Sequence, residues 1–384
     1  MADPLTRPVV DALRRVRRAS GVPLAFGGIV AASSGLRLQH FDGPTVGATE
    51  ANTRLRTVAD AVARTRAAAG VLLITDVDAL LPAEPEPVAA LILDELRSGI
   101  ADGRIAAIGT IDTAAAGDVI DCTGLHVLPG VIDSQVHFRE PGLEHKEDLE
   151  TGSRAAVLGG VTTVFEMPNT NPLTVTEEAL ADKIARATGR MHCDFAFWVG
   201  GTHENAGIVG ELERLPGAAG IKVFMGSSTG DLLVEDDEGV AAILRNTRRR
   251  AAFHSEDEYR LRDRAGERIE GDPSSHPVWR DVEAALKCTK RLVRIARDNR
   301  ARIHVLHIST AEEIEFLAQN KDVATCEALP NHLTFTADDY AERGTLIQMN
   351  PPIREARHRD GIWKGIAQGV IDVLGTDHAP HTRE

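Results

Sequence analysis

The repeating unit of the C-terminal part of the chain is a short apolar stretch followed by an amphipathic stretch of helical length. Apolar runs of strand length occur at 131–138, 161–166, 193–200, 220–225, 250–254, 302–308, 322–327 and 371–376. Amphipathic segments separate most of them, at 147–158, 175–187, 236–248, 280–299 and 311–319. Eight strands in βα alternation predict an α/β fold, a (β/α)8 TIM-type barrel, rather than an open doubly wound sheet.

The N-terminal part of the chain has a different pattern. Residues 1–90 are rich in Ala and Arg and predict a separate α+β segment. Its helical periodicity occurs at 8–19 and 51–68. A Pro-rich run at 82–87 indicates a linker. Short alternating stretches with Gly turns then predict, over 91–130, linker residues and a partial small β-sandwich unit, followed by the barrel at 131–384.

Composition and charge narrow the classes of function. The chain of 384 residues is 43% hydrophobic and 26% charged, which is typical of a folded globular protein. Its formal net charge of −14 at pH 7 argues against a nucleic-acid partner, because phosphate binding needs a concentrated basic face. No apolar run reaches the roughly 18 residues of a membrane span, and the N-terminus lacks the apolar stretch of a signal peptide. We therefore expect no membrane partner.

The cysteines indicate the redox compartment. The four of them lie far apart and form no CxxC pair, at Cys122, Cys193, Cys288 and Cys326. Neither a zinc ribbon nor a thioredoxin-like motif is therefore present. A reducing compartment is the simpler interpretation, and the sequence predicts a cytoplasmic protein.

The end of the first barrel strand carries three polar side chains with a spacing of two. Gln135, His137 and Arg139 project to the same side of a strand, because successive side chains alternate. Imidazole is a good ligand for zinc, and a guanidinium binds a carboxylate bidentately. One strand end thus presents groups for a metal and for an anion.

The fourth predicted strand contains one lysine, Lys222, within an apolar run. Burying an ammonium group costs free energy unless the group is paired or neutralised. A buried lysine of lowered pKa can react with carbon dioxide, and the resulting carbamate would bridge two metal ions. An ion pair between Lys222 and an acid inside the barrel is the alternative, and spacing alone does not decide between the two.

Further candidates follow the other strands. His254 ends the fifth strand, and the sixth contains His304 and His307. Because these two are three residues apart, we expect them to face opposite sides of the sheet, with His307 at the barrel mouth and His304 packed. Asp377 ends the eighth strand, where a carboxylate can bind a metal and accept a proton from water. Their arrival at successive strand ends predicts a metal site at the carboxyl face of the barrel.

Several long motifs occur in an order that resembles the dihydroorotases of the cyclic amidohydrolase group. They are VLPGVIDSQVHFREPGLEHKEDLETGSRAAVLGGVTTVFEMPNTNP, GIKVFMGSSTG, HVLHISTAEE, MNPPIRE and GTDHAPHTRE, and together they span roughly residues 100–384. The resemblance implies a zinc-dependent barrel that interconverts dihydroorotate and N-carbamoyl-aspartate in pyrimidine synthesis, and hence a small anionic substrate. The oligomeric state stays open, with a homo-oligomer among the alternatives.

The resemblance also implies roles for individual residues. His137 would bind the more buried metal, a carbamylated Lys222 would bridge two metals, and Asp377 would be both ligand and general base. His254 and His307 would bind the second metal.

A second group of residues would bind substrate. By the same resemblance, Arg139, Asn169 and His381 would hold the substrate carboxylate, and Asn350 would contact the ring amide. Allantoinase-like and hydantoinase-like relatives usually lack the arginine on the first strand, so Arg139 favours a dihydroorotase over them.

The chain departs from the family pattern in three places. Gln135 stands where the family usually has the first histidine of His-x-His, and an amide oxygen is a weaker zinc ligand, so one zinc or two is open. The sequence ends soon after the eighth strand, which predicts a C-terminally truncated barrel of low stability. Within residues 1–90, the stretch ALRRVRRASGVPLAFGGIVAASSGLRL resembles a GAF-type domain of bacterial regulators. Because of Gln135 and the missing C-terminal segment, a non-catalytic partner subunit is a further alternative.

Overall fold

A computed structural model describes residues 130–226 and 232–382, and earlier in the chain the backbone of strands β1–β7. These strands are β1 (Leu38–Phe41), β2 (Val71–Ile74), β3 (Ala89–Leu93), β4 (Leu96–Ala101), β5 (Arg104–Gly109), β6 (Asp118–Asp121) and β7 (Val127–Leu128). They form two sheets, in the orders β1-β2-β7 and β5-β4-β3-β6. The helices predicted at 8–19 and 51–68 and the linker at 82–87 lie outside the described residues.

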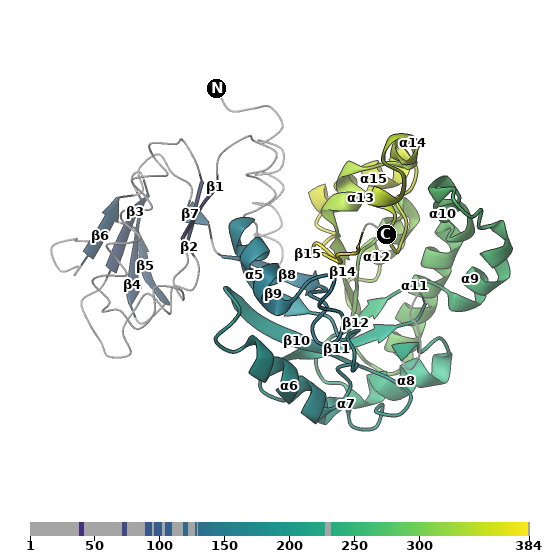
Figure 1. Cartoon of the computed structure of the whole chain (residues 1–384), viewed down its shortest axis with the longest axis horizontal. Helices are drawn as coiled ribbons and strands as arrows, with labels where there is room; N and C mark the ends of the chain where they lie inside the picture. The colour runs from purple at the N-terminus through teal and green to yellow at the C-terminus, as the bar shows by residue number, and fades with distance from the viewer. Residues whose placement is uncertain are drawn as a thin grey trace.

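Eight parallel strands form the ring at the centre of Figure 1. They are β8 (Val131–Val136), β9 (Val161–Glu166), β10 (Asp194–Gly200), β11 (Ala218–Phe224), β12 (Ala251–His254), β13 (Ile303–Val305), β14 (Ala324–Ala328) and β15 (Val373–Leu374). Each strand pairs with the next in sequence. The first strand meets the segment that follows the last through a bridge between Val136 and His378, where the His137 amide donates to the His378 carbonyl over 2.7 Å. The predicted (β/α)8 barrel is confirmed.

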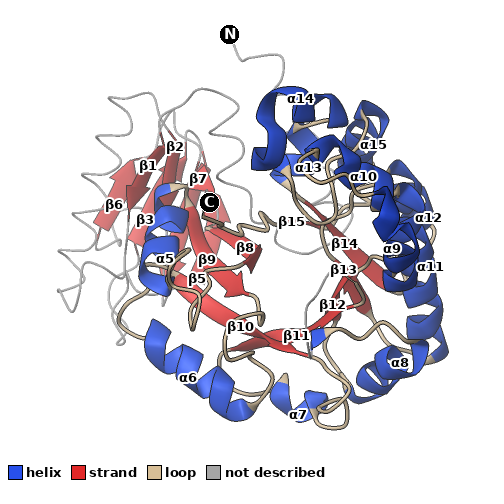
Figure 2. Ribbon diagram, turned by 45° about the vertical axis from the view of Figure 1, so that its right-hand side comes forward, coloured by secondary structure: helices blue, strands red, loops and turns tan. Residues whose placement is uncertain are grey.

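Helices lie around the outside of this ring (Figure 2). The α-helices are α5 (Leu149–Leu158), α6 (Glu177–Ala187), α7 (Val209–Leu212), α8 (Asp237–Asn246), α9 (Glu258–Arg264), α10 (His276–Trp279), α11 (Val282–Asp298), α12 (Ala311–Ala318), α13 (Pro330–Thr334), α14 (Tyr340–Arg343) and α15 (Ala356–Ala367). Short 3-10 turns are η4 (Ala265–Glu267), η5 (Pro273–Ser275), η6 (Ala337–Asp339) and η7 (Gly344–Ile347). No helix in the described part of the chain is long and apolar enough to cross a bilayer.

Side-chain caps begin many of the helices around the barrel. Each cap accepts a hydrogen bond from a backbone amide of the first turn, at Asp148, Thr176, Asp236, Asp257, Asp281 and Thr310. A cap of this kind satisfies an amide that has no partner within the helix, and it stabilises the helix by about 1 kcal/mol. The βα loops therefore end at defined residues, and the loops are where the candidate site lies.

Side-chain alternation along the strands separates two cores. Ile221 and Val223 of β11 pack in the large apolar cluster between the sheet and the helices, so Lys222 points into the barrel. On β12, Ala251 and Phe253 pack in the same cluster, which turns His254 inward. The barrel interior is closed by a smaller cluster of Met167, Trp198, Ala252 and Leu306. The same period of two thus directs polar groups of several strands toward one another.

Candidate active site

Three of the predicted site residues have left-handed backbone conformations at the strand ends. The φ angles are 68° for Arg139, 38° for His307 and 51° for Asp377. Among the described non-glycine residues, only Arg300 also has a positive φ. Such a conformation costs about 1–3 kcal/mol and persists where the surrounding structure enforces it, commonly at functional sites. The backbone at these strand ends therefore has conformations that regular strand packing does not require.

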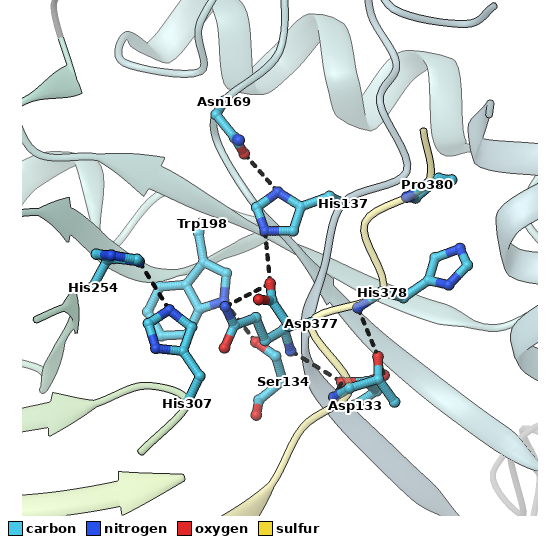
Figure 3. A network of polar contacts seen from close by, with 12 residues as sticks. Asp133, Ser134, His137, Asn169, Trp198, His254, His307, Asp377, His378 and Pro380 are labelled. Carbon is cyan, nitrogen blue, oxygen red and sulfur yellow. Dashed lines mark hydrogen bonds and ion pairs between the residues drawn. The ribbon is translucent and has the colours of Figure 1, made fainter. Parts of the chain in front are cut away.

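His137 and Asp377 form a first pair of ligand-type side chains (Figure 3). His137 Nε2 lies 3.0 Å from Asp377 Oδ1, and His137 Nδ1 lies 2.7 Å from Asn169 Oδ1. Gln135 donates from its amide to the same Asp377 oxygen over 2.9 Å. Burial lowers the pKa of His137, so the ring is neutral and carries one N–H. When that N–H donates to Asn169, the lone pair on Nε2 faces the carboxylate.

His254 and His307 form a second pair, also shown in Figure 3. His254 Nδ1 lies 3.0 Å from His307 Nε2, and His254 Nε2 lies 2.8 Å from Glu256 Oε2. Burial lowers the pKa of both histidines. Burial alone would raise the pKa of Glu256, but Arg280 and His254 hold it well below its usual value. The Glu256 carboxylate therefore takes the N–H of His254 and leaves the Nδ1 lone pair directed at His307.

Lys222 is a buried amine without a hydrogen-bond partner among the described residues. Its Nζ lies 4.1 Å from the centroid of the Phe224 ring. Burial lowers the pKa of Lys222 to about 7, against the opposing charges of Asp377 and Glu327. No described carboxylate lies within ion-pair distance of Nζ. Near neutral pH a large share of this amine is therefore neutral, with the free lone pair that reaction with carbon dioxide requires.

Two pairs of donor atoms in this site have the spacing of ligands of one metal ion. Zinc holds nitrogen ligands at about 2.0–2.1 Å, which puts two ligand atoms of one tetrahedral ion roughly 3.3 Å apart. In both pairs the donor atoms lie 3.0 Å apart, and a lone pair faces the partner atom. The other imidazole nitrogen of His137 and of His254 contacts a further side chain. No group of three or more His, Cys, Asp or Glu side chains in the described part of the chain is arranged to hold a metal. The fit is thus to two ligand pairs with Lys222 as a further donor.

A cationic group lies beside the first pair. Arg139 is buried, with its Nε donating to the Pro380 carbonyl over 3.2 Å. Its Nη2 lies 3.2 Å from Nε2 of His381. Lys146 approaches the same imidazole from the other side, with Nζ 3.3 Å from His381 Nδ1. Sequence reasoning named Arg139 and His381 but missed Lys146, although it stands in the loop after the first strand.

Two predicted substrate residues have other neighbours. Asn169, in the loop after β9, lies against His137, with its Oδ1 2.7 Å from His137 Nδ1. Asn350 is exposed, and its Oδ1 lies 2.9 Å from Nε2 of His276. Sequence reasoning also missed His276 and the carboxylate of Glu256, because nothing in their local sequence distinguishes them from ordinary loop residues.

Comparison with known proteins identifies the family of this chain. The model of the amidohydrolase family matches residues 126–384. The chain belongs to the amidohydrolase family. A dihydroorotase from Halobacterium salinarum is 39% identical over 306 residues, which cover 74% of this chain and 68% of the relative. An allantoinase from Escherichia coli is 35% identical over 304 residues, which cover 73% of this chain and 65% of the relative. The chain thus spans about two thirds of the length of these relatives.

Solved structures agree on the fold. The L-hydantoinase (dihydropyrimidinase) from Arthrobacter aurescens has a TM-score of 0.70 and 27% identity, covering 77% of this amidohydrolase and 70% of that chain. A D-hydantoinase structure has a TM-score of 0.66 at 23% identity, covering 77% and 69%, and supports the fold alone. The barrel of this amidohydrolase is therefore a known architecture, and the choice of substrate depends on its own side chains.

Proposed function

We propose that this amidohydrolase is a dihydroorotase, which reversibly opens the cyclic amide of dihydroorotate to N-carbamoyl-aspartate in pyrimidine biosynthesis. The observation that carries the proposal is Arg139, a buried guanidinium two residues after His137 and in contact with His381. A ring with a carboxylate needs such a group, whereas a neutral ring leaves a buried cation without an anion. The 39% identity to a dihydroorotase supports the same choice.

Two sets of residues would hold metal. His254, His307 and Lys222 would form one set, and His137 with Asp377 the other. Zinc bound there would supply Lewis-acid polarisation of the ring carbonyl and a water whose pKa is lowered to about 7. With Gln135 in place of a histidine, the second set is the weaker, so one or two zinc ions fit this chain.

Asp377 is the proposed general base. Its Oδ1 accepts the proton of the attacking water and later delivers it to the ring nitrogen as the amide bond breaks. His137 and Gln135 both contact this oxygen, and they hold the carboxylate in one orientation. The reverse reaction uses the same groups, with Asp377 taking the proton from the carbamoyl nitrogen.

Arg139 and His381 are proposed to hold the substrate carboxylate. A guanidinium offers two parallel N–H groups to a carboxylate, which fixes the orientation of the ring as well as its position. Asn169 orients His137 through its amide. Asn350 is proposed to contact the ring amide from the loop before α15.

The test is a panel of rings that differ in charge. The purified chain, supplied with zinc and bicarbonate, is assayed with dihydroorotate, allantoin and hydantoin. We expect a preference for dihydroorotate that Arg139→Met lowers by roughly 100-fold or more in kcat/KM. Arg245→Met, at an exposed position of α8, is the matched control. A preference for allantoin or hydantoin would move the assignment to an allantoinase-like or hydantoinase-like enzyme.

One observation favours a second candidate function. Gln135 gives Asp377 an amide N–H where relatives are expected to offer an imidazole lone pair, and this weakens the metal site. A non-catalytic dihydroorotase-like partner subunit would tolerate that loss. A folded, zinc-bearing chain that turns over none of the three rings would support this candidate.

A further inference from the structure

We propose that Lys146 is a third cation of the carboxylate-binding group and helps this site to distinguish an anionic ring from a neutral one. The inference rests on the proposed function and adds to it a residue that neither motif nor family resemblance assigned. Its basis is the arrangement of Arg139 and Lys146 around the imidazole ring of His381.

The imidazole of His381 lies between two cationic donors. Arg139 Nη2 is 3.2 Å from its Nε2, and Lys146 Nζ is 3.3 Å from its Nδ1. A neutral imidazole has one N–H and one lone pair, so it accepts a hydrogen bond from only one of the two. Protonation does not help, because an imidazolium accepts none. Partial burial and the two neighbouring cations also lower the pKa of His381.

One of the two cations therefore lacks an acceptor at this contact. Among the described residues, no carboxylate lies within ion-pair distance of Arg139 or of Lys146. Burial lowers the pKa of Arg139, and burial and the charge of Arg139 lower that of Lys146. An anion placed among the three side chains would accept from all of them and relieve the mismatch at His381.

Acidic residues of the same loop are engaged elsewhere. Each accepts from its own partner: Glu140 from Arg190, Glu144 from the Gly142 amide, and Glu147 pairs with His378. The loop thus brings its cations to the strand end and ties these acids to other groups. None of these acids is hydrogen-bonded to Arg139, Lys146 or His381, and the carboxylates of Asp377, Glu166 and Glu147 act on Arg139 only as neighbouring charges.

Lys146 lies nearer to solvent than Arg139. Arg139 is 6% exposed, whereas Lys146 is half-buried and His381 is exposed. The buried guanidinium fixes the geometry of a carboxylate, and the ammonium adds a flexible point charge at the outer side. Lys146 should therefore affect substrate affinity more than the chemical step.

The test compares Lys146→Met with the wild-type protein, both at full length and loaded with zinc. Lys364→Met, at an exposed position of α15, is the matched control. KM and kcat are measured for dihydroorotate and for dihydrouracil, the same ring without the carboxylate. Affinity for orotate, a planar ring with the same carboxylate, is measured by calorimetry and needs no turnover.

We expect Lys146→Met to raise KM for dihydroorotate and weaken orotate binding by roughly three- to tenfold, with little change in kcat. Values for dihydrouracil and for Lys364→Met should match the wild type. If the wild type binds orotate and turns over dihydroorotate and Lys146→Met does both equally well, the role of Lys146 is overturned while the proposed function stands. If the wild type neither binds orotate nor turns over dihydroorotate, the proposed function is overturned as well.

Discussion

Gln135 donates a hydrogen bond to Asp377 Oδ1 over 2.9 Å, where the first strand of the barrel meets the segment after the last. The same oxygen lies 3.0 Å from His137 Nε2, and the Gln135 amide oxygen is buried without a hydrogen-bond partner among the described residues. A neutral donor thus occupies the position from which an imidazole would present a lone pair. This relationship sets the metal content we expect of the chain.

Restoring a histidine at position 135 should raise that content. We expect Gln135→His to bind more zinc than the wild type, by about one ion per chain, because imidazole is a better zinc ligand than an amide. Zinc is measured by elemental analysis after dialysis against a fixed free-zinc concentration. Gln319→His at the exposed end of α12 controls for an added surface histidine. An unchanged zinc count would contradict the assignment of position 135.

Lys222 should make zinc uptake depend on bicarbonate. In the proposed modification, the neutral amine would attack carbon dioxide, forming an N–C bond and releasing one proton, and the carbamate would offer its oxygens to a metal. We expect zinc uptake by the metal-free wild type to increase with added bicarbonate, and uptake by Lys222→Met to stay low at every concentration. Bicarbonate-independent uptake by the wild type would show that the amine stays unmodified.

The buried ion pair of Lys183 and Glu166 supports the loop that positions Asn169. Lys183 Nζ contacts a Glu166 carboxylate oxygen and donates to the Met167 carbonyl over 3.0 Å, and both side chains are almost fully buried. We expect Lys183→Met to lower the free energy of unfolding by about 3–5 kcal/mol, because it leaves a buried carboxylate without its partner.

The double variant Lys183→Met/Glu166→Leu separates charge from packing in that pair. Since it removes both buried charges, we expect it to regain most of the lost free energy of unfolding. Urea unfolding followed by circular dichroism measures both variants. A double variant no more stable than Lys183→Met would show that packing, rather than the unpaired charge, causes the loss.

Glu327 should make stability depend on pH. It is fully buried on β14, accepts from Ser134 Oγ over 2.9 Å, and burial raises its pKa from 4.5 to about 8, with Asp133 and Asp377 adding to the rise. Between these two values the folded protein keeps a proton that the unfolded chain has lost. The free energy of unfolding therefore falls as the pH rises through this window, by at most about 1.4 kcal/mol per pH unit.

Glu327→Gln removes this titration while keeping the shape. We expect the metal-free variant to become more stable relative to the wild type as the pH rises from 5 toward 8. Urea unfolding at a series of pH values gives the difference. A difference that is constant with pH would mean that Glu327 keeps its ordinary pKa in the folded protein.

The sequence predicted the barrel well because buried parallel strands are continuous apolar runs, each followed by an amphipathic helix. All eight strands occur near their expected positions, and β9 (Val161–Glu166) has the expected bounds. The sixth is much shorter than the expected 302–308, since β13 ends at Val305. Helix α15 (Ala356–Ala367) was not expected, because two glycines and a basic start obscure its periodicity.

The short sixth strand also corrects an expectation about its histidines. Ile303 and Val305 pack against the helices, so His304 points into the barrel, where its Nδ1 lies 2.9 Å from Thr325 Oγ1. His307 also faces inward, toward His254. The alternation argument was wrong because the strand ends between the two histidines and His307 has a left-handed backbone.

Strand-end side chains could be found from sequence, but their supporting partners could not. Position along a strand predicts that His137, Lys222 and His254 point into one barrel. The residues that fix their protonation and direction, such as Glu256 and Asn169, come from loops whose path depends on tertiary packing. Lys146 was missed for the same reason, since only the fold brings its ammonium to His381.

The most direct test of the central claim is hydrolysis of dihydroorotate by the zinc-loaded chain, with Asp377→Asn as the comparison. The variant keeps the size of the side chain and removes its ability to accept a proton. We predict turnover by the wild type and a loss of roughly 100-fold or more in kcat for Asp377→Asn. No turnover by a folded, zinc-bearing wild type, or equal turnover by the variant, would contradict the account.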